Sequence, residues 1–593
     1  MKSPACRGIF FKLIMSAKII IESGLMKKRW VIKNTDSESC RLLVSGLKIH
    51  PVTASILSGR NITSVSQALL FLNPLLTGII DPLQLKGMTD AVKRLFAAHA
   101  NHEPVCIYGD YDVDGITGTA LLVSFLRETG FDCRYFIPNR FDDGYGLNCD
   151  SIKQISSNGA SLIISVDCGI TAVKEALFCK ELGIDLIIVD HHAPGDTIPD
   201  AAAVINPLQP GCNYPFKALA GVGVAFNLLV ALRSVLRDAG IFGSQTGPDL
   251  RQWLDLVALG TIADVVSLTG QNRIYAFHGL KQLSNSNKPG IVALKKVAGI
   301  TGDVSCGQVG FRLAPRLNAA GRMESAVPGV DLLLSNSEQE SQLISSELDA
   351  ANAERQNVER SIFDEAVKLV ETSGIYPDCY TIVLASNDWH QGVVGIVASR
   401  LVERYNRPTI LIAINPDGTA KGSGRSIHGF HLLDALKPCA SFLERFGGHR
   451  YAAGVGINPA NLEAFAKAFE AEAASKLTAD DLIPRFEIDA EIQPEELNSE
   501  LVFELKKLEP FGAGNPEPVL MMRGLQVVER RVVGEGHLKL RLSCEGRSFN
   551  AIAFRLAQRE TDGLIDVAFF PEMNEWNGNS SLQLKIKDLR AAE

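Results

Sequence analysis

The chain has 593 residues, 46% hydrophobic and 21% charged, a globular composition whose length predicts several domains, since single cores stop growing at about 250 to 300 residues. Its formal net charge of −8 argues against a uniformly basic nucleic-acid binder, so any such contact must come from local patches. The twelve cysteines form no Cys-x-x-Cys pair, which argues against a typical structural zinc site and predicts reduced thiols in the cytoplasm.

The N-terminal region carries no motif that suggests chemistry. Apolar stretches within residues 1–25 are interrupted by Lys12 and Lys18, which argues against a membrane span and a secretion signal. From 26 to about 100 the pattern predicts short helices separated by turns. We expect these helices to cover the first face of the sheet that follows.

Three carboxylates at alternate positions follow the first buried strand that the sequence predicts. Residues 105–108 form a short apolar run bounded by Gly109, which is typical of a strand in a parallel sheet. If the backbone stays extended beyond Gly109, the period of two places the carboxylates on one side. Crowded carboxylates repel unless a cation neutralises them, and oxygen ligands favour Mg²⁺ or Mn²⁺ over Zn²⁺. The three residues are Asp110, Asp112 and Asp114.

The arrangement of an apolar strand and a following acid occurs twice more. Residues 162–166 precede Asp167, and residues 186–189 precede Asp190. Segments of helical character separate the strands, so the pattern is βαβαβ and predicts a parallel sheet. Ligands of such sheets bind beyond the carboxyl ends of the strands, where these acids fall. Further candidates are His191, His192 and Asp264, the last of which follows an apolar stretch at 254–261.

A basic segment lies late in this domain, after a proline-rich stretch at 196–215 that predicts a loop. Residues 311–322 hold three arginines, an asparagine and several small residues. This composition suits phosphate binding, because a guanidinium grips phosphate in a fork and small residues let the backbone approach. For any single arginine, an ordinary surface salt bridge is the alternative. The candidates are Arg312, Arg316, Asn318 and Arg322.

One long helix is predicted over 337–373, where apolar residues recur at helical spacing among many charges. A second α/β domain follows, with strands at 381–384 and 409–412. Its glycine-rich segments can offer backbone N–H groups to an anion, and nearby side chains add directed donors. The candidate phosphate contacts are Ser423, Arg425 and His449, and a structural hydrogen bond is the alternative for His449.

Short strands are predicted from about residue 480 onward. Residues 537–543 alternate between leucines and polar or basic residues, so one face is apolar and the other basic. Between residues 521 and 560 there are eight Lys or Arg and four Asp or Glu, a local surplus of four that the net charge hides. We take Lys539 and Arg541 as candidate nucleic-acid contacts. Residues 508–518 are expected to form a structured loop between this region and the core.

Four phrases resemble, in this order, the motifs of the DHH phosphoesterase superfamily and of its RecJ exonucleases in particular. They are GDYDVDG at 109–115, VDCG at 166–169, DHH at 190–192 and GTIADVV at 260–266. Residues 137–141, 143–147 and 219–226 add phrases that resemble RecJ. The resemblance begins at about Met26, where the sequence is similar to the usual start of a RecJ chain. We therefore expect residues 1–25 to be a translation-start artefact.

The resemblance implies an α/β fold: a parallel-sheet DHH domain is joined by a long helix to an α/β DHHA1 domain, and a C-terminal OB-like β-barrel follows. The implied boundaries are 26–100 for the helical lead-in, 101–335 for the DHH catalytic domain, 336–374 for the connecting helix, 375–479 for the DHHA1 domain that grips nucleic acid, and 480–593 for the barrel that binds single strands.

The resemblance also implies phosphodiester hydrolysis with two ions, Mn²⁺ or Mg²⁺. The implied metal ligands are Asp167 as the bridge, Asp114, His191 and Asp264 at one site, and Asp110 and Asp112 at the other. Asp190 would orient His191, and His192 would contact phosphate or donate a proton. Many relatives have a His where this chain has Tyr108, so we expect the second site to be weaker or more hydrated.

The implied function is that of a single-stranded-DNA-specific 5′-to-3′ exonuclease in DNA repair and recombination. A cytoplasmic monomer that works beside single-strand binding protein and a RecQ-type helicase is implied as well. Two rival hypotheses are a DHH enzyme for small substrates, such as a pyrophosphatase or a phosphodiesterase for short oligonucleotides, and an inactive DHH scaffold. The first would lack the long helix and the barrel, and the second would lack ligand acids.

Overall fold

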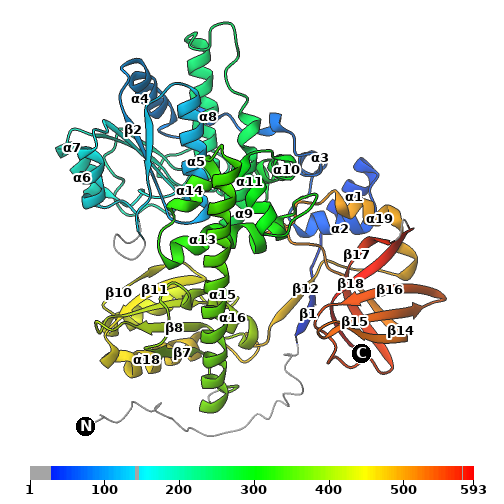
Figure 1. Cartoon of the computed structure of the whole chain (residues 1–593). Helices are drawn as coiled ribbons and strands as arrows, with labels where there is room; N and C mark the ends of the chain where they lie inside the picture. The colour runs from blue at the N-terminus through cyan, green and yellow to red at the C-terminus, as the bar shows by residue number, and fades with distance from the viewer. Residues whose placement is uncertain (1–27, 140–145, 375, 577–578, 593) are drawn as a thin grey trace. The chain divides into compact units, whose positions relative to one another are not determined.

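The computed structural model describes residues 28–139, 146–374, 376–576 and 579–592 (Figure 1). The expected start-site segment 1–25 lies outside these residues, as do residues 140–145, which include part of two phrases that resemble RecJ. Contacts divide the chain into two compact units. One unit joins Ile32–Ala353 to Ile488–Glu593, and the other consists mainly of Glu354–Glu487.

A five-stranded parallel sheet in the order β3-β2-β4-β5-β6 forms the centre of the first unit. Its strands are Val105–Gly109 (β2), Cys133–Phe136 (β3), Leu162–Val166 (β4), Asp185–Val189 (β5) and Ala203–Ile205 (β6). The predicted βαβαβ pattern is confirmed. β3 and β6 were not predicted. β6 lies inside the stretch 196–215, which was expected to be rich in loops, and its three residues are too few to show a period.

Both faces of this sheet are buried, which explains the continuous apolar runs of its strands. Val105 and Ile107 of β2 pack with α5 (Val113–Glu128) and α8 (Gly221–Asp238). Cys106 and Tyr108 point to the other face. There they pack with α6 (Cys149–Ser157) and α7 (Val173–Glu181).

The helical lead-in consists of α1 (Ser37–Leu47), α2 (Pro51–Gly59), α3 (Val65–Leu72) and α4 (Met88–Ala100). Only α4 contributes side chains to the core of the sheet. α2 packs instead on α19 (Ser499–Lys506), where the Glu504 carboxylate accepts hydrogen bonds from the His50 backbone N–H and the Thr53 hydroxyl. The expectation that the whole lead-in covers the sheet was therefore wrong.

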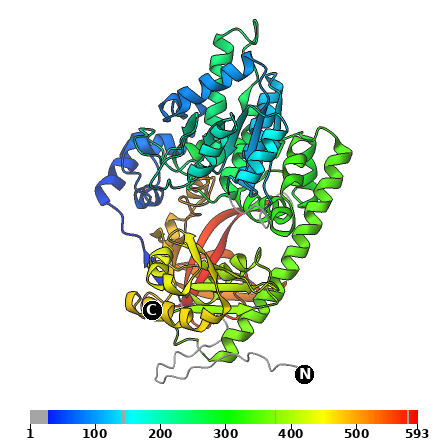
Figure 2. The ribbon, with the colours of Figure 1, turned by 90° about the vertical axis from the view of Figure 1, so that its left-hand side faces the viewer.

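The remaining helices of this unit follow β6. They are α9 (Leu254–Ala263), α10 (Gly270–Asn285), α11 (Pro289–Val297), α12 (Cys306–Gln308), the π-helix η4 (Val309–Leu313), α13 (Ala314–Met323) and α14 (Val327–Leu334). The long helix α15, Glu338–Ser373, is confirmed as one continuous element (Figure 2). Within the described ranges, no helix combines the length and the apolar character that a bilayer span requires.

The second unit contains a five-stranded mixed sheet in the order β10-β11-β9-β8-β7. Its strands are Ile382–Ser386 (β7), Thr409–Ile414 (β8), Ala420–Arg425 (β9), Arg445–Gly448 (β10) and Ala452–Ile457 (β11). One face packs on α16 (Val394–Tyr405) and the C-terminal half of α15. The other face packs on α18 (Leu462–Lys476).

A closed barrel of five strands occupies the C-terminal part of the chain, with strand order β14-β15-β16-β18-β17 and closure between β14 and β17. The strands are Leu520–Val533 (β14), His537–Cys544 (β15), Arg547–Ala553 (β16), Leu564–Trp576 (β17) and Asn579–Ala591 (β18). Leu538, Leu540 and Leu542 point into it, which confirms the predicted alternation. The predicted strand near 485 lies outside the barrel, because β12 (Arg485–Ile488) pairs with β1 (Arg29–Ile32).

Candidate metal centre and nucleic-acid contacts

The predicted acids gather at the carboxyl edge of the parallel sheet. Asp110 and Asp112 follow β2, Asp167 follows β4, and His191 follows β5. β2 has β3 on one side and β4 on the other, so the chain reverses its direction of winding between β2 and β4. Such a switch point is where open parallel sheets bind ligands.

The backbone does not stay extended beyond Gly109, which corrects the expected position of Asp114. α5 begins at Val113, and the side chain of its N-cap residue Asp112 accepts from the backbone N–H of Asp114 at 2.9 Å. Asp114 therefore lies in the first helical turn. Its carboxylate reaches the start of another helix, α8, and accepts from the N–H groups of Gly221 at 2.6 Å and Val222 at 2.8 Å.

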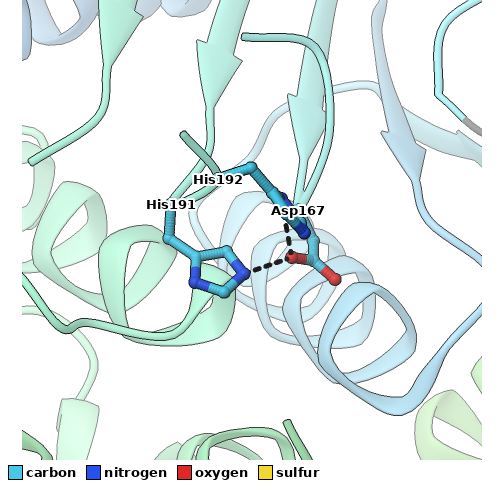
Figure 3. A group of neighbouring side chains, drawn as sticks. All are labelled: Asp167, His191 and His192. Carbon is cyan, nitrogen blue, oxygen red and sulfur yellow. Dashed lines mark ion pairs between the residues drawn. The ribbon is translucent and has the colours of Figure 1, made fainter. Parts of the chain in front are cut away.

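Three overlapping groups of side chains are nevertheless close enough to hold metal ions, and in each the ligand atoms lie within 4.8 Å of one another. The groups are Asp110, Asp112 and Asp167; Asp114, His191 and Asp264; and Asp167, His191 and His192. Asp167 and His191 each belong to two of them. Figure 3 shows both imidazoles facing the Asp167 carboxylate, with 3.0 Å from His191 Nε2 to Asp167 Oδ1.

The electrostatics of this centre favour a bound cation. Burial, followed by repulsion from neighbouring carboxylates, raises the pKa of Asp114 to about 7 and that of Asp264 to about 9, and it raises the pKa of Asp167 as well. Nε2 of His191 and Oδ2 of Asp264 are buried without a hydrogen-bond partner among the described residues. A divalent cation would neutralise the carboxylates and fill these positions with oxygen and imidazole ligands, so the residues present fit Mn²⁺ or Mg²⁺.

The two histidines have different partners. Burial, and next the charge of His192, lowers the pKa of His191 to about 4, which keeps the ring neutral as metal ligation requires. Asp190 does not hold the His191 ring, which corrects the expected role of Asp190. Its carboxylate accepts from Nδ1 of His192 at 2.8 Å, while His191 forms a hydrogen bond with the backbone of Leu219. Burial opposes protonation of His192, but the bond and the charge of Asp190 outweigh it and raise its pKa.

Two residues of the centre have backbone conformations that side chains rarely adopt. Asp167 has a φ of 64°, and Val265, next to Asp264, has a φ of 59°. β-branched residues are strongly disfavoured at such angles. Strain of this kind persists where the surrounding structure imposes it, and it concentrates at functional sites.

Tyr108 occupies the position at which many relatives have a histidine. The residue is fully buried, and its hydroxyl donates to the Gly146 carbonyl at 3.0 Å and accepts from the Asn148 amide at 3.3 Å. The phenol is therefore held by the loop that precedes α6. Weaker binding at the site of Asp110 and Asp112 stays a prediction.

Two glycines contribute to the centre in a way that the sequence patterns did not reveal. A Cβ atom on Gly221 would lie 2.9 Å from Asp167 Oδ1 and 3.1 Å from Asp114 Oδ2. A Cβ atom on Gly260 would lie 3.1 Å from Asp114 Oδ1. Both glycines stand inside phrases that resemble RecJ, and that was the one available signal.

The basic segment at 311–322 is helical, and some of its side chains already have partners within the protein. Arg316 pairs with Asp349 at 2.8 Å and also donates to backbone carbonyls, while Arg312 is exposed. The Asn318 side chain accepts from the Val113 N–H at 3.2 Å, at the start of α5. Arg322 is partly buried. Phosphate binding by these residues stays a prediction, with Arg312 the best placed to reach a ligand.

The glycine-rich segment around Ser423 and Arg425 is a strand inside the sheet, which corrects the expectation that its backbone N–H groups face an anion. Ser423 and Arg425 lie in β9, whose backbone pairs with β8 on one side and β11 on the other. Any phosphate contact there must come from side chains. Arg425 Nη1 donates to the Ser423 hydroxyl at 2.9 Å, and His449 is exposed beyond β10.

The exposed basic face of the barrel extends from β15 onto the neighbouring strand β14. Lys539 and Arg541 are exposed on β15. The register of β14 places exposed Arg531 directly opposite Lys539, and Arg541 is opposite Glu529. Strand pairing of this kind cannot be read from one strand.

Three family models match the chain in the order of its domains. The DHH family N-terminal domain matches residues 104–261, the DHHA1 domain matches 378–475, and the RecJ OB domain matches 488–588. The single-stranded-DNA-specific exonuclease RecJ of Salmonella typhimurium is 38% identical over 583 residues, which covers 95% of this chain and 100% of that protein. This chain belongs to the RecJ family.

Other RecJ proteins agree. RecJ of Bacillus subtilis is 40% identical over 576 residues, covering 96% of this chain and 71% of that protein. The crystal structure of RecJ from Thermus thermophilus in complex with Mn²⁺ has a TM-score of 0.82 and 33% identity, and the match covers 95% of this chain and 80% of that one. A structure of the same protein with Mg²⁺ has a TM-score of 0.76. The predicted succession of DHH, DHHA1 and OB-like domains is thus confirmed.

Proposed function

We propose that this chain is a single-stranded-DNA-specific exonuclease that hydrolyses phosphodiester bonds from the 5′ end with Mn²⁺ or Mg²⁺. The observation that carries the proposal is the convergence of three possible ligand groups, two of which share Asp167, at the switch point of a DHH domain. The three RecJ domains in one chain support single-stranded DNA as the substrate.

Each side chain of the centre has its own proposed role. Asp167 would bridge the two sites, one completed by Asp114, His191 and Asp264 and the other by Asp110 and Asp112. Bound divalent ions supply Lewis acidity and a water of lowered pKa. The α8 N-terminus holds Asp114 in place through two backbone N–H groups, which limits the motion of that ligand.

His192 is the best candidate for a proton donor to the leaving group. Asp190 holds its Nδ1 and raises its pKa, so the imidazolium form is favoured. Its side chain keeps 34% of its surface exposed, whereas that of His191 keeps 12%. Its raised pKa favours the protonated ring, which cannot ligate a metal, and its partial exposure lets it reach a substrate, so a role in proton donation or phosphate contact suits His192 better than metal ligation.

The residues that would grip the strand are Arg312, Arg316, Asn318, Arg322, Ser423, Arg425, His449, Lys539 and Arg541. Side chains rather than backbone amides make these contacts in the second unit. We further propose that the enzyme is a cytoplasmic monomer that serves DNA repair and recombination. Its proposed partners are single-strand binding protein and a RecQ-type helicase.

Digestion of end-labelled DNA tests the proposal. Single-stranded DNA, blunt double-stranded DNA and a dinucleotide are incubated with Mn²⁺, Mg²⁺ or a chelator, and products are resolved over time. We expect nucleotides to be released from the 5′ end of the single strand only, and only with metal. Activity confined to dinucleotides would favour an enzyme for small substrates, and absence of hydrolysis with every metal would favour a scaffold.

A further inference from the structure

The loop at 508–516, which leads into the barrel, touches the segment that follows the last ligand acid. The Leu268 N–H donates to the Ala513 carbonyl at 2.7 Å. A Cβ atom on Gly514 would lie only 2.0 Å from the hydroxyl oxygen of Ser267. The backbones of the two segments therefore meet without room for an added methyl group.

A buried arginine on α10 holds the same loop from the other side. Arg273 is 2% exposed and donates to the carbonyls of Lys507 at 3.2 Å, Leu508 at 2.9 Å and Glu509 at 2.7 Å. Its guanidinium also donates to the Phe71 carbonyl and lies 3.9 Å from the centroid of that ring. A buried charge is tolerated only when such bonds replace water, so this set fixes the loop to the catalytic unit.

Asn272, the neighbour of Arg273, extends the contacts toward the metal centre. The side chain is fully buried, and its Nδ2 donates to the carbonyls of both Ser267 and Ala218. One amide group thus links the segment after α9 to the segment before α8.

The segment before α8 holds two of the proposed ligands. Leu219, next to Ala218, forms a backbone hydrogen bond with His191. The Gly221 N–H holds the Asp114 carboxylate. Contacts therefore run without a break from the 508–516 loop to the residues around Asp114, His191 and Asp264.

We propose that the 508–516 loop and Asn272 form a brace that positions the group Asp114, His191 and Asp264. The loop into the barrel would then be a positioning element of the metal centre as well as a connection. This inference rests on the proposed metal-dependent function. Groups that hold ligands from outside the coordination shell typically contribute about 10- to 100-fold to metal affinity or activity.

The alternative is that these contacts only hold two domains together. In that case a disturbed loop lowers stability or the grip on long DNA, but it leaves metal affinity and the hydrolysis of very short substrates unchanged. The test therefore measures Mn²⁺ affinity by electron paramagnetic resonance and the kcat for a dinucleotide, which is too short to need the barrel.

Gly514→Ala is the test variant, and Gly183→Ala is its matched control. Gly514 has a φ of 68° and Gly183 a φ of 70°, so both substitutions strain the backbone alike, but a Cβ atom on Gly183 meets nothing within 4 Å. We expect Gly514→Ala to weaken Mn²⁺ binding and lower the dinucleotide kcat about tenfold, and Gly183→Ala to match the wild type.

A second variant separates positioning from failure to fold. Ser267→Gly combined with Gly514→Ala removes the hydroxyl that the new methyl group would meet, so we expect it to recover most of the Mn²⁺ affinity and kcat. Thermal unfolding of each variant checks the fold. No recovery in a folded double variant would overturn the brace.

Other results also decide the question. Equal Mn²⁺ affinity and equal kcat in the two single variants, or a loss limited to long-strand binding, would refute positioning by the loop. If the wild type neither binds Mn²⁺ nor degrades single-stranded DNA, the proposed function fails. If the wild type does both and the variants behave alike, only the brace fails.

Discussion

Several structural constraints meet at Asp167. It is buried, it adopts a left-handed backbone conformation, and it belongs to two of the three possible ligand groups. Asparagine keeps its shape and tolerates positive φ better than alanine does, while it removes the charge. Asp167→Asn is therefore the cleanest single change at the centre.

We expect Asp167→Asn to lower nuclease activity by more than about a hundredfold, the upper end of what loss of an outer-shell partner costs. Without metal, the variant should be more stable than the wild type at neutral pH, because the buried Asp167 must otherwise either stay charged among carboxylates or take up a proton that the unfolded chain releases. Activity assays and urea unfolding in chelator measure the two effects. Activity within tenfold of the wild type would rule out the bridging role.

Metal binding should release protons. The raised pKa values of Asp264, about 9, and Asp114, about 7, mean that the metal-free centre holds protons at pH 7, and a cation must displace them. We expect Mn²⁺ affinity to rise between pH 6 and pH 8, with about one proton or more released per ion. Calorimetry in buffers of different ionisation enthalpy measures this release. Affinity independent of pH would contradict the raised pKa values.

At the residue scale, the sequence predicted which side chains gather at the sheet edge better than it predicted their hydrogen-bond partners. An acid after an apolar strand is a local pattern, so Asp110, Asp112 and Asp167 could be placed without a structure. Whether Asp190 forms a hydrogen bond with the ring of His192 or with that of His191 depends on how the two imidazoles are oriented after β5. Sequence spacing does not record this orientation. The pairing of Arg316 with Asp349 joins distant turns of the fold and was equally out of reach.

At the element scale, the start of α8 lies close against two of the proposed ligands. We expect Gly221→Ala to disturb Asp114 and Asp167 and to weaken Mn²⁺ binding about tenfold or more. Gly223→Ala is the matched control, because it lies in the same helical turn and its Cβ atom would meet only ordinary contacts at 3.5 Å or more. Equal Mn²⁺ affinity in the two variants would show that the close approach at Gly221 has no effect on the ligands.

The central strand of the second unit supplies another test. Arg425→Ala should reduce degradation of long single strands far more than hydrolysis of a dinucleotide, since the smaller substrate lacks the phosphates that this unit would grip. Arg404→Ala, which removes an exposed cation paired with Glu371 on another element, is the control. Rates on both substrates measure the difference. An unchanged rate on long strands would remove Arg425 from the interface.

Helices and strands were predictable where helical spacing of apolar residues continued over many turns, or where a strand was an unbroken apolar run. α15 shows many turns of helical spacing, and β2, β4 and β5 are unbroken apolar runs. β9 was misjudged because Gly422 and Gly424 are typical of turns, although here they let the neighbouring strands and side chains approach. β3 and β6 sit at the edges of the sheet and are too short to show a period.

At the scale of the whole molecule, the net charge of −8 conceals the basic face of the barrel. Replacing Lys539 and Arg541 by Ala should weaken binding to long single strands and flatten its salt dependence, by roughly 0.7 in the slope for each lost phosphate contact. Hydrolysis of short oligonucleotides should change little. Binding isotherms across a salt series provide the measurement, with Arg237→Ala on α8 as a control. Equal losses on both substrates would assign this face to catalysis or folding.

The proposed ligands are far apart along the chain, and this spacing has a consequence for synthesis. A ribosome-bound chain that ends before Asp264 already carries Asp110, Asp112 and Asp167 but lacks a member of the second ligand group. If the brace operates, that group gains its support only when Ala513 has been made. A chain that stops before Asp264 would then lack a proposed ligand, and one that stops between Asp264 and Ala513 would bind the metal about tenfold more weakly. A prematurely terminated chain would therefore be a poorer nuclease than one that includes the brace.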